Sequence, residues 1–343
     1  MRPRTDPITP PNKEKTPMSQ TYAPPGQLWL LPQSQQEGLD LDHRQVIAVV
    51  EQAYRALREG GSNNPVKTII DDPGHHSLSY SMVARDGGSG TVCFKAVYEF
   101  DPRRSRDSYR FHSFVFLVDD TTGAPIALMD VVKLGPLRSS ATTALFARAA
   151  CPDARTALVV GTGVQGQAAL PMLVAAMPEL ERLQVFGTYP DGLRAVQDSV
   201  DGREVEIVKD LRGAAGEADI VIGASGLSAT EEVRRDWMKP GSVAVLLGYG
   251  VHADVCHGAD YRIATDTAQM HATCDDLRGE DGSLPSVDAQ LPDILLGLAP
   301  ARRHRDDVVF AYNSGMAVTD AALGRYIADL ARADGRGEKV NFW

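Results

Sequence analysis

Hydrophobic residues recur every three or four positions between residues 42 and 59, in the segment DHRQVIAVVEQAYRALRE. This spacing places the apolar side chains on one face and predicts a helix that packs on a core. Asp42 is a suitable amino-terminal cap, and the pair Gly60-Gly61 follows the last apolar residue. We therefore expect one amphipathic helix with both ends marked in the sequence.

The pattern changes to strands after this helix. Short runs rich in β-branched and aromatic residues are separated by turn sequences such as Asp86-Gly87-Gly88 and Thr122-Gly123. Such runs, bounded by glycine and aspartate, are typical of antiparallel strands joined by tight turns. The expected strands cover residues 77–84, 91–97, 112–118 and 124–129. The first region thus predicts a helix and a largely antiparallel sheet.

From Leu137 onward, apolar strands alternate with helical segments. Continuous apolar runs such as DIVIG and SVAVLL are typical of parallel strands that are buried on both faces. Alternating strands and helices predict a doubly wound parallel sheet over about residues 137–315, and hence an α/β fold. The expected strands are 157–160, 182–186, 204–208, 219–223, 242–247, 262–265 and 308–310, and the expected helices are 139–150, 167–177, 191–199 and 318–332.

A glycine-rich turn lies inside this second region. The strand at residues 157–160 is followed by Gly161-Thr162-Gly163-Val164-Gln165-Gly166 and then by a helix of small residues. Gly161 permits a tight turn, Gly163 lets a pyrophosphate approach the backbone, and Gly166 lets the helix pack closely on the strand. We interpret it as a dinucleotide-binding turn; the alternative is a glycine-rich turn in an ordinary parallel sheet.

Composition and charge narrow the class of protein. The 343 residues are 43% hydrophobic and 23% charged, as in ordinary globular proteins, and the net charge of −10 speaks against nucleic acid and acidic membranes as partners. No apolar run approaches the roughly 18 residues of a membrane span, and the amino end has no apolar signal core. Four scattered cysteines show no metal-binding spacing, so we expect no metal, reduced thiols and a cytoplasmic location.

Four passages, taken in order, resemble the ornithine cyclodeaminase and mu-crystallin family. They are Pro65-Val66-Lys67, Val92-Cys93-Phe94-Lys95, the segment LRSSA that begins at Leu137 and leads to GTGVQ, and the segment FAYNSGMAVTD that begins at Phe310. Together these passages span about residues 42–335, so the resemblance covers most of the chain.

The resemblance implies two domains and a homodimer. It implies a substrate-binding and dimerisation domain at residues 28–136, completed by a carboxyl-terminal helix at 318–343, and a dinucleotide-binding Rossmann domain at 137–317. Residues 1–27, rich in Pro, Thr, Lys and Gln, are expected to form a flexible tail. The overall prediction is a Rossmann-type doubly wound sheet plus a smaller α+β domain.

The resemblance also implies NAD or NADP as cofactor and a small amino or imino acid as substrate. Arg138 and Lys95 lie at family positions near the substrate, and Lys67 falls where many members carry arginine. A guanidinium can hold a carboxylate through two parallel hydrogen bonds, whereas a lysine supplies a point charge. Lys95 is the expected carrier of protons; the alternative for all three is an ordinary surface charge. The cofactor-binding residues expected on the same basis are Gly161, Gly163, Val164, Gln165, Gly166, Thr188, Ser225, Gly248, Ser314 and Gly315.

Two departures from the family pattern bear on the reaction and the cofactor. Members that cyclise ornithine carry an aspartate where Gly250 stands here, and Asp254 reaches that site only with a different loop. His252 and His257 are alternative proton donors or simply structural residues. At the end of the second Rossmann strand, Gly187-Thr188 replaces the carboxylate typical of NAD sites, which mildly favours NADP.

The interpretation that follows is an NAD(P)H-dependent imine reductase or amino-acid dehydrogenase that transfers hydride to or from the α-carbon of a small α-imino or α-amino acid. Within the enzymes, the alternative is a redox-neutral cyclodeaminase. Outside them, it is a crystallin-like protein that binds NADPH and a small ligand without turnover.

Overall fold

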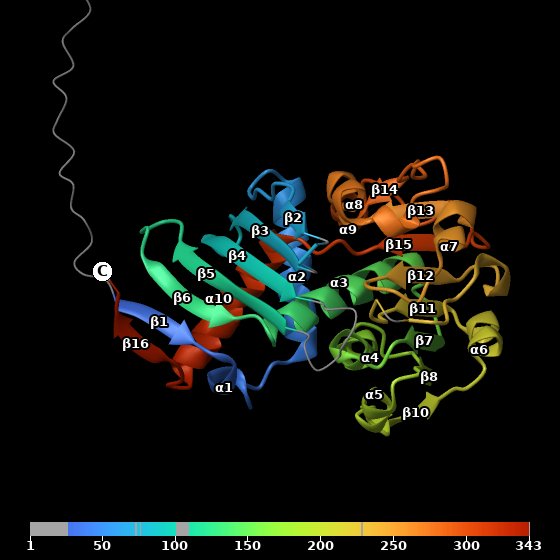
Figure 1. The fold of residues 1–343 in the computed structure, drawn as a ribbon, viewed down its shortest axis with the longest axis horizontal. Coiled ribbons are helices and arrows are strands. Elements are labelled where there is room, and N and C mark those ends of the chain that lie inside the picture. The colour runs from blue at the N-terminus through green and yellow to red at the C-terminus, as the bar shows by residue number, and fades with distance from the viewer. Residues whose placement is uncertain (1–26, 73, 76, 101–109, 228, 343) are drawn as a thin grey trace, which may run out of the picture.

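The described residues form two β-sheets that stand next to each other, with helices between and around them (Figure 1). The computed structural model describes residues 27–72, 74–75, 77–100, 110–227 and 229–342. The tail expected at residues 1–27 lies outside these ranges except for Gln27.

The first sheet is the mixed, mostly antiparallel sheet expected from the first region. Its strand order is β16-β1-β6-β5-β4-β3-β2, and every pair is antiparallel except β1 with β6. The four predicted strands are confirmed; three are longer than predicted by two or three residues, and the fourth is shifted by one residue. Their bounds are β1 Gln27–Leu31, β2 Thr68–Asp72, β3 Ser77–Asp86, β4 Thr91–Phe100, β5 Arg110–Asp119, β6 Pro125–Asp130 and β16 Glu338–Asn341.

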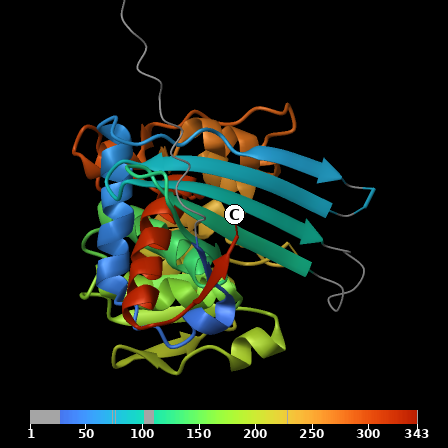
Figure 2. The ribbon, with the colours of Figure 1, turned by 90° about the vertical axis from the view of Figure 1, so that its left-hand side faces the viewer.

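Two long helices lie beside each other against this sheet (Figure 2). They are α2, His43–Arg58, and α10, Ala317–Ala333, and a short α1, Gln33–Gln36, precedes them. The amphipathic helix expected at 42–59 is confirmed, and the Asp42 side chain accepts a hydrogen bond from Arg44 N. Because α10 contacts β3, β4 and β5, the chain returns to the first sheet after crossing the second.

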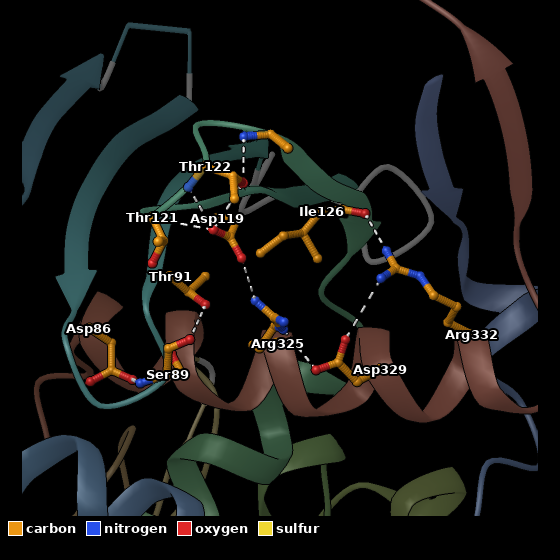
Figure 3. A network of polar contacts seen from close by, with 11 residues as sticks. Asp86, Ser89, Thr91, Asp119, Thr121, Thr122, Ile126, Arg325, Asp329 and Arg332 are labelled. Atoms are coloured by element: carbon orange, nitrogen blue, oxygen red, sulfur yellow. Dashed lines mark hydrogen bonds and ion pairs between the residues drawn. The ribbon is translucent and has the colours of Figure 1, made fainter. Parts of the chain in front are cut away.

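Polar contacts attach α10 to the turn between β5 and β6 (Figure 3). Arg325 donates to Asp119 at 3.3 Å and to Asp329 at 2.7 Å, while Arg332 donates to the carbonyl of Ile126 at 3.2 Å. The contacts run along one side of the helix, so they orient it on the sheet. This orientation decides which residues of the first turn of α10 face β4.

The second sheet has the doubly wound arrangement expected from the alternating pattern. Its order is β14-β13-β15-β12-β11-β7-β8-β10-β9, and all pairs are parallel except β9 with β10. The strands are β7 Thr156–Val160, β8 Arg182–Phe186, β9 Ser199–Val200, β10 Arg203–Ile207, β11 Ile220–Gly223, β12 Val243–Leu246, β13 Tyr261–Ala264, β14 Ala289–Gln290 and β15 Val309–Tyr312. The connecting helices are α3 Leu134–Ala150, α4 Val164–Ala176, α5 Pro190–Arg194, α6 Leu211–Glu217, α7 Ala253–Gly258, α8 Thr267–Thr273 and α9 Leu291–Leu295.

The strand order reverses between β7 and β11. From β7 the chain winds outward through β8 and β10, and it then returns to place β11 on the other side of β7. Ligands of such sheets bind outside the carboxyl ends of the strands at this reversal. The glycine turn follows β7 directly, so it lies at this point.

Apolar side chains bury both faces of the central strands. Along β7, Ala157 and Val159 belong to the core that also contains α2, α3 and α10, while Leu158 and Val160 belong to a second core on the opposite face. This explains the continuous apolar runs in the sequence. None of the described helices has the length and apolar character needed to span a bilayer.

Some local predictions were wrong. α3 begins at Leu134, not at residue 139, because Leu134 is buried in the core. Residues 191–199 do not form one helix. Only α5 is helical, and Ser199–Val200 pairs with β10 across a tight turn in which Asp201 has a φ of 49°. The strands β1, β2, β9, β14 and β16 were not predicted. The carboxyl-terminal helix expected at 318–343 ends at Ala333, because Glu338–Asn341 forms β16 and pairs with β1.

Candidate active site

Lys95 lies on the inner face of the first sheet, in the middle of β4. Residues alternate along this strand, so Cys93, Lys95 and Val97 point inward while Phe94 and Tyr98 are exposed. The lysine side chain is 3% exposed. A charge in this position needs a partner, because an unpaired buried charge is strongly destabilising.

Asp320, in the first turn of α10, is that partner. Its Oδ1 accepts a hydrogen bond from Lys95 Nζ at 2.9 Å and lies 3.4 Å from Arg138 Nε, while Oδ2 has no hydrogen-bond partner. The side chain is fully buried. One carboxylate thus faces cations from a strand and from another helix.

Arg138 approaches from the first turns of α3, and its side chain is 14% exposed. Gly315 lies directly against its guanidinium: a Cβ at Gly315 would stand 2.2 Å from Arg138 Nη1, and Gly315 has a φ of 65°. The backbone after β15 therefore leaves room for this arginine only because residue 315 is glycine. Arg138 Nε makes no hydrogen bond to the described residues.

Lys67 completes the cluster from the segment that leads into β2. Its Nζ donates to the carbonyl oxygen of Ser314 at 2.7 Å and lies 5.9 Å from the centre of the Tyr80 ring. Burial, followed by the positive charges of Arg138 and Lys95, lowers the pKa of Lys67 from 10.5 to about 8, against the opposite effect of Asp320. Burial also raises the pKa of Tyr80 to about 12, so this phenol stays neutral.

The cluster carries more positive than negative charge. Lys67, Lys95 and Arg138 are three cations that act on one another and on the single carboxylate Asp320. Burial lowers the pKa of Lys95, and the neighbouring Asp320 opposes that effect. In a poorly solvated position, an excess of cations favours binding of an anion, and the guanidinium geometry suits a carboxylate.

Neighbouring polar residues hold the loop after β15 in place. Ser314 Oγ and Thr265 Oγ1 are 2.5 Å apart, and Ser314 N donates to the same threonine at 3.2 Å. Asn313 Nδ2 donates to the Ser139 carbonyl at 2.9 Å and to Thr143 Oγ1 at 3.1 Å. These contacts tie the loop to β13 on one side and to α3 on the other.

The glycine turn is shaped by close backbone contacts. A Cβ at Gly161 would lie 2.4 Å from Ala224 O, and one at Gly166 would lie 2.0 Å from Gly161 O. Gly161 also has a φ of 126°. Gly163, in contrast, has open space where a Cβ would stand. Two glycines are therefore required by packing, and the third leaves the surface of the turn clear.

The amino end of α4 opens onto this clear surface. Gly163 is its N-cap and offers no side chain to the first backbone N–H groups. The neighbouring Val164 is 64% exposed, and Gln165 Oε1 is buried without a hydrogen-bond partner. Free N–H groups and the helix dipole make such an end suitable for a phosphate group.

The glycine turn and the charged cluster lie along one edge of the parallel sheet. The strands β15, β12, β11 and β7 are consecutive neighbours, so the carboxyl ends of β15 and β7 are about 14 Å apart across the sheet. Between them, Ser225 Oγ donates to Val160 O at 3.0 Å, and Gly248 lies so close that a Cβ would stand 2.7 Å from Ser225 O. An elongated ligand can follow this edge.

The hydrogen bonds that Asp254 makes are to residues outside the cluster. It accepts hydrogen bonds from Arg234 Nη1 at 3.3 Å and from Arg235 N at 3.2 Å, and its side chain is 41% exposed. Two histidines were considered as proton donors in the sequence. His252 accepts a hydrogen bond from Asp254 N at 3.1 Å, and His257 contacts the carbonyl of Leu277 at 2.9 Å. These residues have structural partners among the described residues.

Gly250 is confined as well. It has a φ of 101°, and a Cβ there would lie 2.9 Å from both Ser225 Oγ and Val160 Cγ1. An aspartate at this position would be strained by the backbone and would displace neighbouring atoms. The loop is thus built for glycine where ornithine-cyclising relatives are expected to carry an acid.

The end of β8 carries no carboxylate among its first following residues, Gly187-Thr188-Tyr189, and Thr188 is exposed. The two nearby arginines are engaged in surface ion pairs. Arg182 contacts Glu206 and Glu217, and Arg194 contacts Asp191.

Sequence reasoning brought Lys67, Lys95 and Arg138 to attention but did not assign a role to Asp320. The sequence did contain an indication of this role, because an aspartate in the first turn of an otherwise apolar, buried helix needs a cationic partner. Thr265, Asn313 and Tyr80 carried no comparable signal. No group of three or more potential metal ligands occurs among the described residues.

Known proteins resemble this chain over most of its length. The model of the ornithine cyclodeaminase/mu-crystallin family matches residues 31–335. Among curated proteins, nodulation efficiency protein NfeD of Rhizobium meliloti is 26% identical over 309 residues, covering 89% of this chain and 95% of that protein. Delta(1)-pyrroline-2-carboxylate reductase of Paracoccus denitrificans is also 26% identical, covering 80% and 91% respectively.

A solved structure shows the same fold. Thermococcus litoralis Delta(1)-pyrroline-2-carboxylate reductase, in complex with NADH and L-proline, superposes with a TM-score of 0.81 at 22% identity, covering 91% of this chain and 100% of that chain. With a family model matching nearly the whole chain, the protein belongs to the ornithine cyclodeaminase/mu-crystallin family.

The lowered pKa of Lys67 makes a prediction about stability. Between about pH 8 and 10.5 the unfolded chain keeps a proton on Lys67 that the folded protein has lost, so stability rises with pH in this window. Urea unfolding should therefore show wild type gaining roughly 1–3 kcal/mol relative to Lys67→Met from pH 7.5 to 10.5. The control is Lys209→Met, at an exposed lysine, and the wild type should gain no stability relative to this variant over the same pH range. A parallel pH dependence of wild type and Lys67→Met would contradict the prediction.

Proposed function

We propose that this protein is an NAD(P)H-dependent imine reductase or amino-acid dehydrogenase acting on a small α-imino or α-amino acid. The observation that carries the proposal is the partly buried cluster of Lys67, Lys95 and Arg138 around the buried Asp320, at the same sheet edge as the glycine turn. The cluster offers an anion site and the turn a phosphate site, within the length of a dinucleotide.

The glycine turn fits the pyrophosphate of a nicotinamide cofactor. Gly163 leaves the approach open, and the first N–H groups of α4 have no side-chain cap. Ser225 and Gly248 line the path from the turn toward Ser314 and Gly315, beside the charged cluster. When bound, the reduced cofactor supplies a hydride. The relative from Thermococcus litoralis was solved with NADH, which supports this assignment.

The cluster fits the carboxylate of an α-imino acid. Arg138 has a donor without a hydrogen-bond partner and faces the loop that carries Ser314 and Gly315. Clamping the carboxylate fixes the adjacent imine carbon relative to the sheet edge. In the reduction, that carbon gains the hydride and the nitrogen gains a proton, which a lysine of the cluster has to supply. The L-proline bound to the Thermococcus litoralis relative has the corresponding carboxylate.

The crowding at Gly250 supports reduction over redox-neutral cyclodeamination. Cyclising members are expected to use an aspartate there, and this backbone has no room for one. Asp254 is engaged by Arg234 and by the backbone of Arg235. A crystallin-like binding role is the remaining alternative, and turnover separates it from the enzyme.

NADP is the cofactor we favour, because none of the three residues directly after β8 carries a carboxylate that would repel a 2′-phosphate. We also propose a cytoplasmic location, which fits four cysteines that form no disulfide. The domain roles stay as predicted: residues 28–136 with 318–343 bind substrate and form the dimer, and residues 137–317 bind the dinucleotide.

A homodimer would cover the outer face of the first sheet. On this face Val83, Phe94, Tyr98 and Phe114 are between 41% and 49% exposed, and Phe94 contacts Phe116 at 6.2 Å between ring centres. A continuous apolar surface on adjacent strands is costly in water and suits a second copy of the same face.

Gly163→Val should abolish NADPH binding while the protein still folds, because its side chain would occupy the open approach to the turn. Gly166→Val is the matched comparison. Its Cβ would meet Gly161 O at 2.0 Å, so that variant should lose folding stability instead. Fluorescence titration with NADPH and thermal unfolding distinguish the two, and unchanged affinity in Gly163→Val would contradict the proposed cofactor site.

Thr188→Asp should weaken NADPH binding about tenfold relative to NADH, which corresponds to about 1.4 kcal/mol of repulsion. Position 188 is preferred to 187, where a Cβ would lie 2.6 Å from Thr162 Cγ2. Affinities are compared at equal ionic strength. Tighter binding of NADH than NADPH by the wild type would show that the preference was assigned wrongly.

Arg138→Lys should raise the KM for a cyclic imino acid such as Delta(1)-pyrroline-2-carboxylate roughly tenfold or more, because the two-pronged hydrogen bond is lost. Oxidation of NADPH by the imine is the measurement, and unchanged NADPH affinity is the control. Wild type should not convert ornithine to proline; efficient, cofactor-neutral conversion would favour the cyclodeaminase.

Light scattering should report a dimer for the wild type and a monomer for Phe94→Glu, which places a charge in the centre of the apolar face. Leu298→Glu is the control, since Leu298 is 63% exposed in the segment after α9. A monomeric wild type would refute the homodimer.

A further inference from the structure

We infer that Lys67, and not Lys95, gives the proton to the imine nitrogen, because Lys67 is bonded to a neutral carbonyl while Lys95 is held in a buried ion pair. This inference rests on the proposed function and names the proton donor within it. It differs from the sequence-based expectation, which assigned proton transfer to Lys95.

Burial lowers the pKa of Lys95 as well, but the geometry of its ion pair makes this lysine a poorer proton donor than Lys67. Lys95 Nζ lies 2.9 Å from Asp320 Oδ1, and the two side chains are 3% and 0% exposed. Deprotonation would remove one of the two cations that Asp320 contacts, in a position where water cannot compensate. The pair is better suited to keep a fixed positive charge next to the substrate.

Lys67 can lose its proton without losing its contact. Its partner, the Ser314 carbonyl at 2.7 Å, accepts a hydrogen bond from an ammonium and still accepts one, although a weaker one, from a neutral amine. The same loop places Gly315 against Arg138, the proposed carboxylate clamp. The amine is therefore held at the site in both protonation states.

The segment before Lys67 is anchored on two elements. Asn64 Oδ1 accepts from Val318 N at 2.8 Å, and Gln269 Nε2 donates to Pro65 O at 2.9 Å. One contact is to the first turn of α10 and the other is to α8. Anchoring on both sides restricts where Lys67 can move, as positioned acid–base groups require.

The charged and titratable groups around Lys67 favour release of its proton. Arg138 on α3 and Lys95 on β4 repel the ammonium, while Asp320 on α10 stabilises it. Tyr80 on β3 faces it and is neutral, with a pKa of about 12. With burial these groups bring the pKa of Lys67 to about 8, near the pH at which an acid catalyst works best.

The step balances without a further reactant. Protonated Lys67 transfers one proton to the imine nitrogen, and the resulting iminium carbon accepts the hydride and its two electrons from the reduced nicotinamide. The C=N double bond becomes a single bond, and Lys67 is left neutral until it takes a proton from water. In the reverse direction, neutral Lys67 accepts the proton from the amino acid's nitrogen.

Lys67→Arg is the decisive variant, because arginine keeps the positive charge but does not give up a proton at these pH values. We measure kcat and KM for Delta(1)-pyrroline-2-carboxylate with NADPH over a range of pH. Wild-type kcat should fall as the pH rises through about 8. Lys67→Arg should lose about 100-fold in kcat and lose this titration, with NADPH affinity and KM little changed.

Lys95→Arg separates the two lysines. It should retain the titration near pH 8, because Lys67 is intact, whatever its effect on KM. A second readout needs no turnover: ¹⁵N NMR of the lysine amines should show a group titrating near pH 8 that disappears in Lys67→Arg.

The outcomes distinguish the inference from the proposed function. If wild type reduces the imine and Lys67→Arg keeps its kcat and pH profile, Lys67 is only a charge and the inference is overturned. Loss of the titration in Lys95→Arg would likewise return the role to Lys95. If wild type reduces no imino acid, the proposed function itself is wrong, and the inference with it.

Discussion

The buried carboxylate of Asp320 is the constraint on which the site depends. It meets Lys95 from β4 and Arg138 from α3, so three elements distant in the sequence converge on one residue. Removing one partner of a buried ion pair typically costs about 3–5 kcal/mol, since the remaining charge is left without compensation. The position of α10 on the first sheet is thus coupled to the geometry of the cluster, and the contacts of Arg325 and Arg332 support the same placement.

The excess of positive charge links this arrangement to function. Asp320 cannot neutralise Lys95, Arg138 and Lys67 together, and repulsion from Arg138 and Lys95 adds to burial, the larger cause, in lowering the pKa of Lys67. A substrate carboxylate would offset the excess positive charge, and this attraction would bind the substrate. The same carboxylate would favour the protonated form of Lys67 until the proton is transferred. In the proposed reaction, charge balance therefore connects substrate recognition and proton transfer in one cluster.

Membership of the family leaves several reactions open, and small backbone features bear on the choice. Gly250 has a left-handed φ and lies against Ser225 and Val160, so the loop after β12 excludes an acid by packing as well as by sequence. Asp254, the nearest substitute along the chain, makes its contacts with Arg234 and Arg235. Both features favour hydride transfer to an imine over chemistry that needs an aspartate at this place.

The sequence by itself determined the class of fold. Apolar periodicity marked the helix at 42–59, the strands on both sides of the glycine turn and the turn itself, because these depend on local patterns. It also singled out Lys67, Lys95 and Arg138, although their roles came from resemblance to a family. The short strand β1 and the edge strand β16 were not predicted because their pairing partners are distant in the chain. Only the tertiary structure decided that Asp320 joins two cations and that Lys67 meets a neutral carbonyl, because burial and charge balance arise from packing between distant segments.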